Sequence, residues 1–329
     1  MREDNDGPTI FYKDLMSAPT ETEKPLGPTG SDPSIEAESS FSDRIPAYVE
    51  LTKMRISIMV VLTFIVAAII SQPIFINPVV LFWGTIGCLL ICFSGNAMNM
   101  FVERKTDSLM PRTAGRPLPA EKLTSAEVLI FGAVTFIAST AIFWLLVNWQ
   151  TAMCAVVNWI VYVIIYTPLK RKTWFNTEIG AVAGSLPVLM GSLATTETVP
   201  LIAWAFFGVL VFWQFPHFMA IAWKYRHEYK AGGLQMLTVV DPSGKRAGLK
   251  AVVTCVLLII CSLIPVLEVR AIFQVILLVV IALIVGVPYL KASIAFNADP
   301  NDITAKKLMR SSLLYLPLYM AGLLIVCLT

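Results

Sequence analysis

The stretch NMFVERKTDSLMPRTAGRPLP, residues 99–119, combines side chains that bind metal ions with side chains that bind phosphates. Asn99, Glu103 and Asp107 are spaced four residues apart, so on a helix they lie along one stripe. Two carboxylates at this spacing repel each other unless a cation lies between them. Carboxylate and amide oxygens suit Mg²⁺, which is usually held by one or two carboxylates together with substrate phosphates. The stripe is therefore a candidate magnesium site.

Two arginines follow the stripe, again four residues apart. Arg112 and Arg116 carry guanidinium groups, which are suited to bidentate contact with phosphate oxygens. Metal ligands followed by arginines indicate a site for a magnesium-bound diphosphate. The alternative is a solvated helix end in which Glu103 and Asp107 pair with neighbouring cations, an arrangement that is common and adds little stability.

The composition places these residues in a membrane protein. The chain has 329 residues, of which 57% are hydrophobic and 14% charged, and its mean hydropathy is +0.72. Soluble domains carry about a quarter charged residues. The apolar residues form runs long enough to cross a hydrocarbon core of about 30 Å as helices. We expect an all-α integral membrane protein with about nine transmembrane helices, at residues 56–72, 79–101, 126–147, 150–168, 177–194, 200–222, 251–267, 271–290 and 312–328.

The charges of the connections predict the orientation. Short connections alternate with longer basic ones, and all the Lys and Arg residues except Arg270 fall on the side of the basic connections and the N-terminus. The positive-inside rule makes that side cytoplasmic, with the N-terminus inside and the candidate site facing the cytoplasm. The N-terminus has no apolar signal-peptide core, and it is acidic, unlike a mitochondrial transit peptide. The expected location is the bacterial cytoplasmic (inner) membrane.

The N-terminal segment differs from the rest of the chain. Residues 1–43 contain ten Asp and Glu against three Lys and Arg, with few large apolar residues. Such a segment cannot bury enough apolar surface to offset the entropy lost on ordering. We therefore expect a disordered acidic tail at 1–43 and a transmembrane domain at 44–329. The expected surroundings are the lipid bilayer, and no nucleic-acid partner is predicted.

Four stretches resemble the UbiA superfamily of intramembrane prenyltransferases. Residues 99–119 resemble its first aspartate-rich motif, NxxxDxxxD followed by MxRTxxRPL, although Glu103 stands where the family usually has Asp. The other three are YTPLKRKTWFNTEIGAVAGSLPVLMG at 166–191, WQFPHFMAIAW at 213–223 and YRHEYKAGGLQMLTVVDP at 225–242. The WQFPHF stretch is similar to a signature of the haem-farnesylating branch, the haem O synthases. The resemblance covers about residues 44–329.

The resemblance implies a UbiA-type helical bundle with Mg²⁺ as cofactor. It implies transfer of the farnesyl group of farnesyl diphosphate to a vinyl group of haem B, with addition of water, giving haem O and diphosphate. Haem B is then a substrate. The residues implied for metal or diphosphate binding and catalysis are Asn99, Glu103, Asp107, Arg112, Arg116, Lys170 and Arg171. Those implied for substrate binding are Asn176, Trp213, Gln214, His217, Tyr225, Arg226, His227 and Glu228.

Two histidines have more than one interpretation. His217 lies in an apolar run, where ionisable groups usually face a cavity. It is either a neutral core histidine hydrogen-bonded across helices or a contact to haem, through the iron or a propionate. His227 is either solvated or binds a phosphate when protonated. His227 and Glu228 stand where the resembled family has Glu-Asp, so a second Mg²⁺ near Glu228 stays open.

Other functions remain alternatives at this stage. The nearest is a UbiA-type prenyltransferase that acts on a quinone precursor or a chlorin. A membrane transporter is a second alternative, but transporters tend to place ionisable groups near the membrane midplane, whereas here they gather at one face. On the haem hypothesis, haem A synthase or terminal-oxidase assembly factors are the protein partners that the pathway implies.

Overall fold

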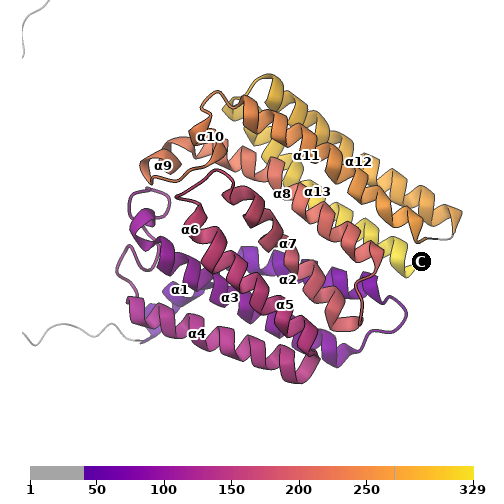
Figure 1. Cartoon of the computed structure of the whole chain (residues 1–329), viewed down its shortest axis with the longest axis horizontal. Coiled ribbons are helices and arrows are strands. Elements are labelled where there is room, and N and C mark those ends of the chain that lie inside the picture. Colours follow the sequence, from indigo (N-terminus) through magenta and orange to yellow (C-terminus); the bar gives the residue numbers. More distant parts are fainter. Residues whose placement is uncertain (1–40, 270) are drawn as a thin grey trace, which may run out of the picture. The chain divides into compact units, whose positions relative to one another are not determined.

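The computed structural model describes residues 41–269 and 271–329, and this part of the chain forms helices and no strands (Figure 1). It contains nine helical segments long and apolar enough to cross a membrane, which confirms the number of spans expected from hydropathy. The predicted acidic tail falls outside the described residues, except that residues 41–43 already belong to the first helix.

Thirteen α-helices are found in the described residues, and several combine into one span. Their bounds are α1 (Phe41–Thr52), α2 (Met54–Ser71), α3 (Pro78–Asp107), α4 (Ser125–Ile142), α5 (Trp149–Trp159), α6 (Thr167–Leu169), α7 (Asn176–Thr195), α8 (Leu201–Lys224), α9 (Arg226–Ala231), α10 (Leu237–Val240), α11 (Lys245–Leu263), α12 (Ile272–Ala298) and α13 (Asp302–Leu328). The π-helical segment η1 (Phe143–Val147) extends α4, the π-helical segment η2 (Ile160–Tyr166) joins α5 to α6, and the 3₁₀ segment η3 (Ile264–Leu267) extends α11.

Several helices extend beyond the apolar runs that predicted them. The last span was expected from residue 312, but α13 begins at Asp302 because the Asn301 side chain caps it, accepting from the backbone N–H groups of Ile303 and Thr304. Hydropathy detects only the apolar part of such a helix. The extension that matters most is in α3, which continues without interruption to Asp107. The stripe expected past Phe101 is therefore helical.

Four loops, including the two longest, meet at one end of the bundle, which we call the basic end. It comprises the loops at 108–124, 170–175, 225–244 and 299–301, with α9 and α10 inside the third of them (Figure 1). Contacts between the loops hold this end together. The backbone N–H of Gln235 donates to the carbonyl of Lys170 at 2.7 Å, and Arg226 pairs with Asp302 at 3.1 Å. The basic end therefore has a defined structure in which loop residues can form a site.

Small residues allow the helices to pack closely, as is usual in membrane bundles. Between α3 and α4, Ser94 donates to the carbonyl of Gly132 and Ser139 donates to the carbonyl of Gly87, both at 2.7 Å. Between α2 and α7, a Cβ atom on Gly191 would collide with the backbone carbonyl of Phe64. A backbone carbonyl cannot change rotamer to relieve a steric clash, so this contact requires glycine.

Gly191→Ala is accordingly expected to lower the stability of the bundle by about 1–3 kcal/mol, the usual cost of overpacking a core. The measurement is the thermal unfolding midpoint of the purified protein in detergent. Gly115→Ala is the matched control, because nothing lies within 4 Å of a Cβ built on Gly115. Equal midpoints for the two variants would show that α2 and α7 are not packed as described.

Candidate active site

The polar stripe of α3 is covered by residues from three other parts of the chain. Asn99 is 1% exposed, and its Oδ1 accepts a hydrogen bond from Lys53 Nζ at 2.8 Å. Its Nδ2 donates to Thr167 Oγ1 at 3.2 Å. Lys53 comes from the junction of α1 and α2, and Thr167 from α6. The amide thus has one partner on each side, both far away in sequence.

Each carboxylate of the stripe is paired with a cation. Lys170 Nζ lies 2.8 Å from Glu103 Oε1. An Arg116 guanidinium nitrogen lies 2.7 Å from Asp107 Oδ2 and 4.0 Å from Glu103 Oε2. Arg116 returns to the stripe because the loop after α3 turns tightly, with Thr113 Oγ1 donating to the carbonyl of Asp107 at 2.9 Å. These ion pairs agree with the simpler alternative considered above, but Asp107 is only 1% exposed, so its pair is not a solvated surface contact.

The donor set fits a hard cation such as Mg²⁺. In the described residues no three His, Cys, Asp or Glu side chains form a metal cluster, so any ion would depend on two carboxylates and one amide. Asp107 Oδ1 is buried and has no hydrogen-bond partner among the described residues. Buried polar atoms are normally satisfied, and an orphaned carboxylate oxygen is a ready ligand. Mg²⁺ commonly takes its remaining ligands from water and substrate phosphate. Asn99, Glu103 and Asp107 therefore stay the predicted ligands.

Lys170 is positioned to remain charged. Burial opposes its charge, but the neighbouring Glu103 carboxylate outweighs this effect and raises the pKa of Lys170 above its ordinary value. Its ammonium also lies 4.6 Å from the centre of the Tyr166 ring, a cation–π arrangement. Lys170 is therefore available as a cation at neutral pH beside the stripe.

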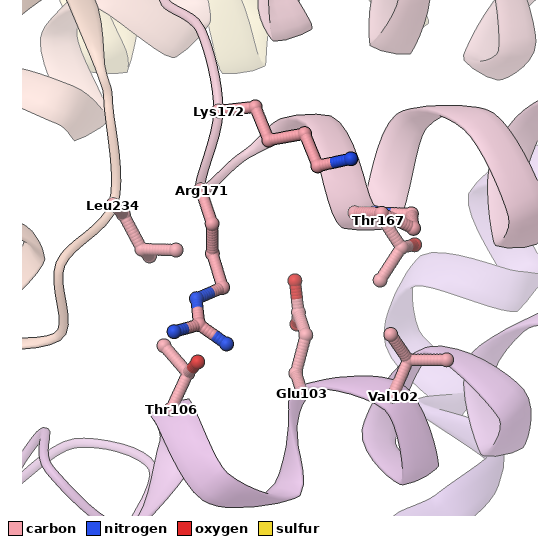
Figure 2. Close-up of a pocket in the computed structure, with 8 residues that line it drawn as sticks. Val102, Glu103, Thr106, Thr167, Arg171, Lys172 and Leu234 are labelled. Carbon is pink, nitrogen blue, oxygen red and sulfur yellow. The ribbon is translucent and has the colours of Figure 1, made fainter.

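A pocket of about 390 Å³ opens beside Glu103 at the basic end. Figure 2 shows the Glu103 carboxylate and the Arg171 guanidinium pointing into it, from α3 and from the loop after α6. Thr106, Thr167 and Lys172 also line it. A pocket with a carboxylate and basic side chains in its walls has the chemistry needed for a magnesium-bound phosphate group.

Arg112 is held away from the stripe by α9. Its guanidinium lies 4.2 Å from the centre of the Tyr225 ring and donates to the Tyr229 hydroxyl at 3.3 Å. Its backbone N–H donates to Glu228 at 3.4 Å. The two arginines of the opening motif therefore face different partners.

The remaining predicted residues of this region do not converge on the stripe. Arg226 pairs with Asp302 and donates to the carbonyl of Trp223, and His227 is exposed. Asn176 is fully buried, and its Nδ2 donates to the carbonyls of Thr173 and Gln235 at 2.7 and 3.2 Å. In this structure the Asn176 amide ties two loops together.

A second cavity, of about 620 Å³, lies between the helices. Residues from α2, α3, α5, η2, α7, α8 and α13 line it, and they include Trp213, Gln214 and His217. Most of the other lining side chains are apolar or aromatic, as expected for a site that binds a largely apolar ligand. The haem-related residues expected from the sequence thus share one cavity.

His217 makes a hydrogen bond across helices and also faces this cavity. Its Nδ1 lies 2.7 Å from Ser312 Oγ, which donates its own proton to the carbonyl of Met309 at 2.6 Å. Ser312 has one hydroxyl proton, so when it donates to Met309, Nδ1 is the protonated nitrogen and Nε2 keeps its lone pair. The Trp213 ring stacks on the imidazole with centroids 4.9 Å apart. Both interpretations of His217 offered by the sequence are compatible with this geometry.

Gln214 has a packing role in the same wall. Its Nε2 donates to the carbonyl of Ala181 and to Ser185 Oγ, both on α7, at 3.0 and 2.9 Å. These bonds join α8 to α7 beside the cavity.

Sequence reasoning did not find Lys53 and Thr167, which contact Asn99, or Tyr162 and Tyr166, which line the second cavity. Lys53 resembles a topology anchor in the sequence, since it precedes an apolar run, and Tyr162 and Tyr166 resemble ordinary residues of a membrane helix. The sequence did contain one indication of a role for Tyr166 and Thr167, because they begin the stretch at 166–191 that resembles the UbiA superfamily. Lys53 has no such signal, and only its contact with Asn99 reveals it.

An all-helical membrane bundle with paired carboxylates and cations at one end, above an apolar cavity, has the architecture of an intramembrane prenyltransferase. The model of the UbiA prenyltransferase family matches residues 60–314, and the chain belongs to this family. The protein is thus an integral membrane prenyltransferase.

Two curated proteins within this family are similar to the chain over most of their length. The chain is 39% identical to "Protoheme IX farnesyltransferase" of Rhodopirellula baltica, covering 82% of this chain and 96% of the relative. It is 36% identical to the protein of the same name from Opitutus terrae, covering 88% of this chain and 96% of the relative.

Solved structures show the same fold. A digeranylgeranylglyceryl phosphate synthase structure has a TM-score of 0.72 at 19% identity, covering 87% of this chain and 99% of that one. A UbiA homolog from Archaeoglobus fulgidus bound to DMAPP and Mg²⁺ has a TM-score of 0.60 at 15% identity, covering 84% and 98%.

Proposed function

We propose that the protein transfers the farnesyl group of farnesyl diphosphate to a vinyl group of haem B, with addition of water, to give haem O and diphosphate. The observation that carries this proposal is the pair of relatives named protoheme IX farnesyltransferase, which match across most of both chains. The cavity that contains His217 next to an aromatic wall supports a flat, metal-containing acceptor. Haem B is a substrate in this reaction and not a resident cofactor.

The diphosphate binds at the basic end, next to the α3 stripe. Arg116 and Lys170, which now pair with Asp107 and Glu103, are the cations within reach of its oxygens. Arg171 points into the same pocket and adds a third positive charge. Concentrated positive charge stabilises the negative charge that develops on the departing diphosphate. These residues therefore make diphosphate a better leaving group.

Asn99, Glu103 and Asp107 would hold Mg²⁺. The ion, when bound, neutralises phosphate charge and acts as a Lewis acid at the leaving oxygen. The UbiA homolog solved with DMAPP and Mg²⁺ supports this assignment by its fold. Lys53 orients the Asn99 amide by donating to its Oδ1, and Thr167 accepts from its Nδ2.

The covalent step balances without a protein nucleophile. The bond between C1 of the farnesyl group and the diphosphate oxygen breaks, and its electron pair leaves with diphosphate. The terminal vinyl carbon of haem supplies the electron pair for the new carbon–carbon bond. Water then adds to the carbon next to the porphyrin ring and loses a proton. The apolar cavity keeps other water away from the allylic cation.

His217 is proposed as a contact to the haem iron. Its Nε2 keeps a lone pair because Nδ1 donates to Ser312, and neutral imidazole is a common axial ligand of haem. Trp213 holds the imidazole plane by stacking on it. Tyr225 and Glu228 act by placing Arg112.

We place the protein in the bacterial inner membrane with the basic end in the cytoplasm. The clustering of basic loops at that end supports this orientation. Farnesyl diphosphate would then enter from the cytoplasm. Haem A synthase and terminal-oxidase assembly factors are the partners that would receive the product.

The proposal is tested by incubating the purified protein with haem B, farnesyl diphosphate and Mg²⁺ and analysing the porphyrin by mass spectrometry. We expect a mass gain of one farnesyl group plus water, and we expect EDTA to abolish it. Prenylation of a quinone precursor instead of haem would overturn the acceptor but keep the diphosphate site. A folded protein that prenylates neither acceptor would overturn the proposed function.

A further inference from the structure

Arg55 lies at the opening of the 620 Å³ cavity, and none of the described residues pairs with it. It belongs to the first turn of α2, near the basic end, and it is exposed while also lining the cavity. The structure gives it no hydrogen bond or ion pair with any described residue. Three neighbouring basic residues are engaged, because Lys53 donates to Asn99, Lys170 pairs with Glu103, and Arg116 pairs with Asp107. Arg171 and Lys172 line the smaller pocket beside Glu103 and do not line this cavity.

The rest of the cavity wall carries no formal charge that could neutralise an anion. Among the described residues that line it, Arg55 is the only Asp, Glu, Lys or Arg. Several of the polar lining groups are already used by the protein: Ser57 Oγ donates to the carbonyl of Thr52, and the Asn96 amide donates to the same carbonyl and to Ser57. An anionic group on a ligand in this cavity has one cation available to it.

We propose that Arg55 binds a carboxylate of the acceptor, a haem propionate, and thereby selects the orientation in which haem enters the cavity. This inference rests on the proposed function and adds a recognition site to it. Burying a carboxylate in an apolar cavity without a partner costs several kcal/mol. A haem molecule inside this cavity must therefore keep its propionates at the opening, where Arg55 can pair with them in bidentate fashion.

Two contacts then orient the acceptor. The haem iron lies at the centre of the porphyrin and the two propionates lie on one edge, so a bond to His217 and a pair with Arg55 together fix the ring in its plane. The vinyl groups, which lie on the other side of the ring, then point away from Arg55 into the cavity. Orientation of this kind converts binding energy into a productive geometry.

The beginning of α2 also separates the binding sites of the two anionic groups, the diphosphate and the haem propionate. Lys53 and Arg55 are two residues apart, but Lys53 directs its ammonium to Asn99 on the α3 stripe, whereas Arg55 lines the cavity. The backbone at Lys53 is left-handed, with φ 45°, a conformation that non-glycine residues rarely adopt. Lys53 lies between α1 and α2 and Arg55 lies in the first turn of α2, and the two side chains reach different sites. Lys53 therefore lies on the diphosphate side, and Arg55 lies where it can bind the propionate carboxylate.

The experiment compares haem with haem dimethyl ester, in which both propionates are blocked. Binding to wild type and Arg55→Gln is titrated in detergent by the Soret absorbance, and KM for both substrates is measured with the full-length protein. We expect Arg55→Gln to weaken haem binding by about tenfold, the scale of a charged hydrogen bond that is partly exposed. The ester should bind wild type and variant equally weakly, and KM for farnesyl diphosphate should not change.

Arg310→Gln is the matched control. Arg310 on α13 is also exposed and has no ion pair among the described residues, but it does not line the cavity. It should bind haem and the ester as wild type does. Repeating the titration with anionic phospholipid added tests whether Arg55 instead holds a lipid phosphate.

Three outcomes would overturn the inference about Arg55. The proposed function is judged separately, by whether the wild-type protein farnesylates haem. The first is an unchanged haem affinity in Arg55→Gln. The second is an equal loss of affinity for haem and for its dimethyl ester. The third is a loss that appears only when anionic phospholipid is present, which would assign Arg55 to a lipid phosphate.

Discussion

Replacing Asp107 by Asn is expected to lower kcat by on the order of 10³-fold, the scale of losing one preorganised electrostatic contact to a transition state. The Asp107 carboxylate is buried, one oxygen pairs with Arg116, and the other has no partner. The amide has almost the same shape but no charge, so it holds a divalent cation weakly. The Mg²⁺ concentration needed for half-maximal activity should rise in parallel.

The control for this prediction is Glu197→Gln. Glu197 is an exposed acid in the loop after α7, at the end of the bundle opposite the basic end, and its removal changes the net charge equally. Both variants should elute as folded protein and unfold near the wild-type temperature. Wild-type turnover by Asp107→Asn at limiting Mg²⁺ would show that this residue is not a metal ligand.

Replacing Lys53 by Met is expected to lower kcat/KM for farnesyl diphosphate by about 10²-fold, the lower range for one lost electrostatic donor. Lys53 donates to Asn99 at 2.8 Å, so its amino group lies beside the ligand stripe. Met preserves the length and apolar contacts of the side chain but removes both the charge and the hydrogen bond. The Asn99 amide then loses the partner that orients its oxygen.

Steady-state kinetics with each substrate varied in turn provide the measurement. KM for haem should stay near the wild-type value, because Lys53 does not line the haem cavity. Lys105→Met is the control, since Lys105 is an exposed lysine on the same helix as the stripe and has no ion pair in the described residues. Equal kinetics for the two variants would assign Lys53 to topology alone.

The sequence predicted the parts of this protein that depend on local order. The lengths of the apolar runs predicted nine spans, which the structure confirms for the described residues, because crossing a membrane needs a minimum number of apolar residues. The spacing of Asn99, Glu103 and Asp107 predicted one polar stripe, because helical periodicity follows from the backbone alone. The motifs predicted the family, which the family match confirms.

The direction of each side chain within the site was not predictable in the same way. Arg112 and Arg116 share one motif and the same spacing as the stripe, yet Arg116 returns to Asp107 while Arg112 stacks on Tyr225. They follow the end of α3, so their directions depend on the turn of the loop and on where α9 packs. The spacing of the two arginines predicts neither the turn of this loop nor the position of α9.

Only the tertiary structure brought together groups that are distant in sequence. Lys53 reaches Asn99 across 46 positions, and His217 meets Ser312 across 95. Hydropathy identifies which segments lie in the membrane. It does not show which side of each helix faces the other helices. Rotation is decided by how small residues such as Gly191 allow neighbouring helices to approach, and this packing determines which side chains face the cavity. Sequence alone therefore established the class of protein, whereas helix packing decided the composition of its site.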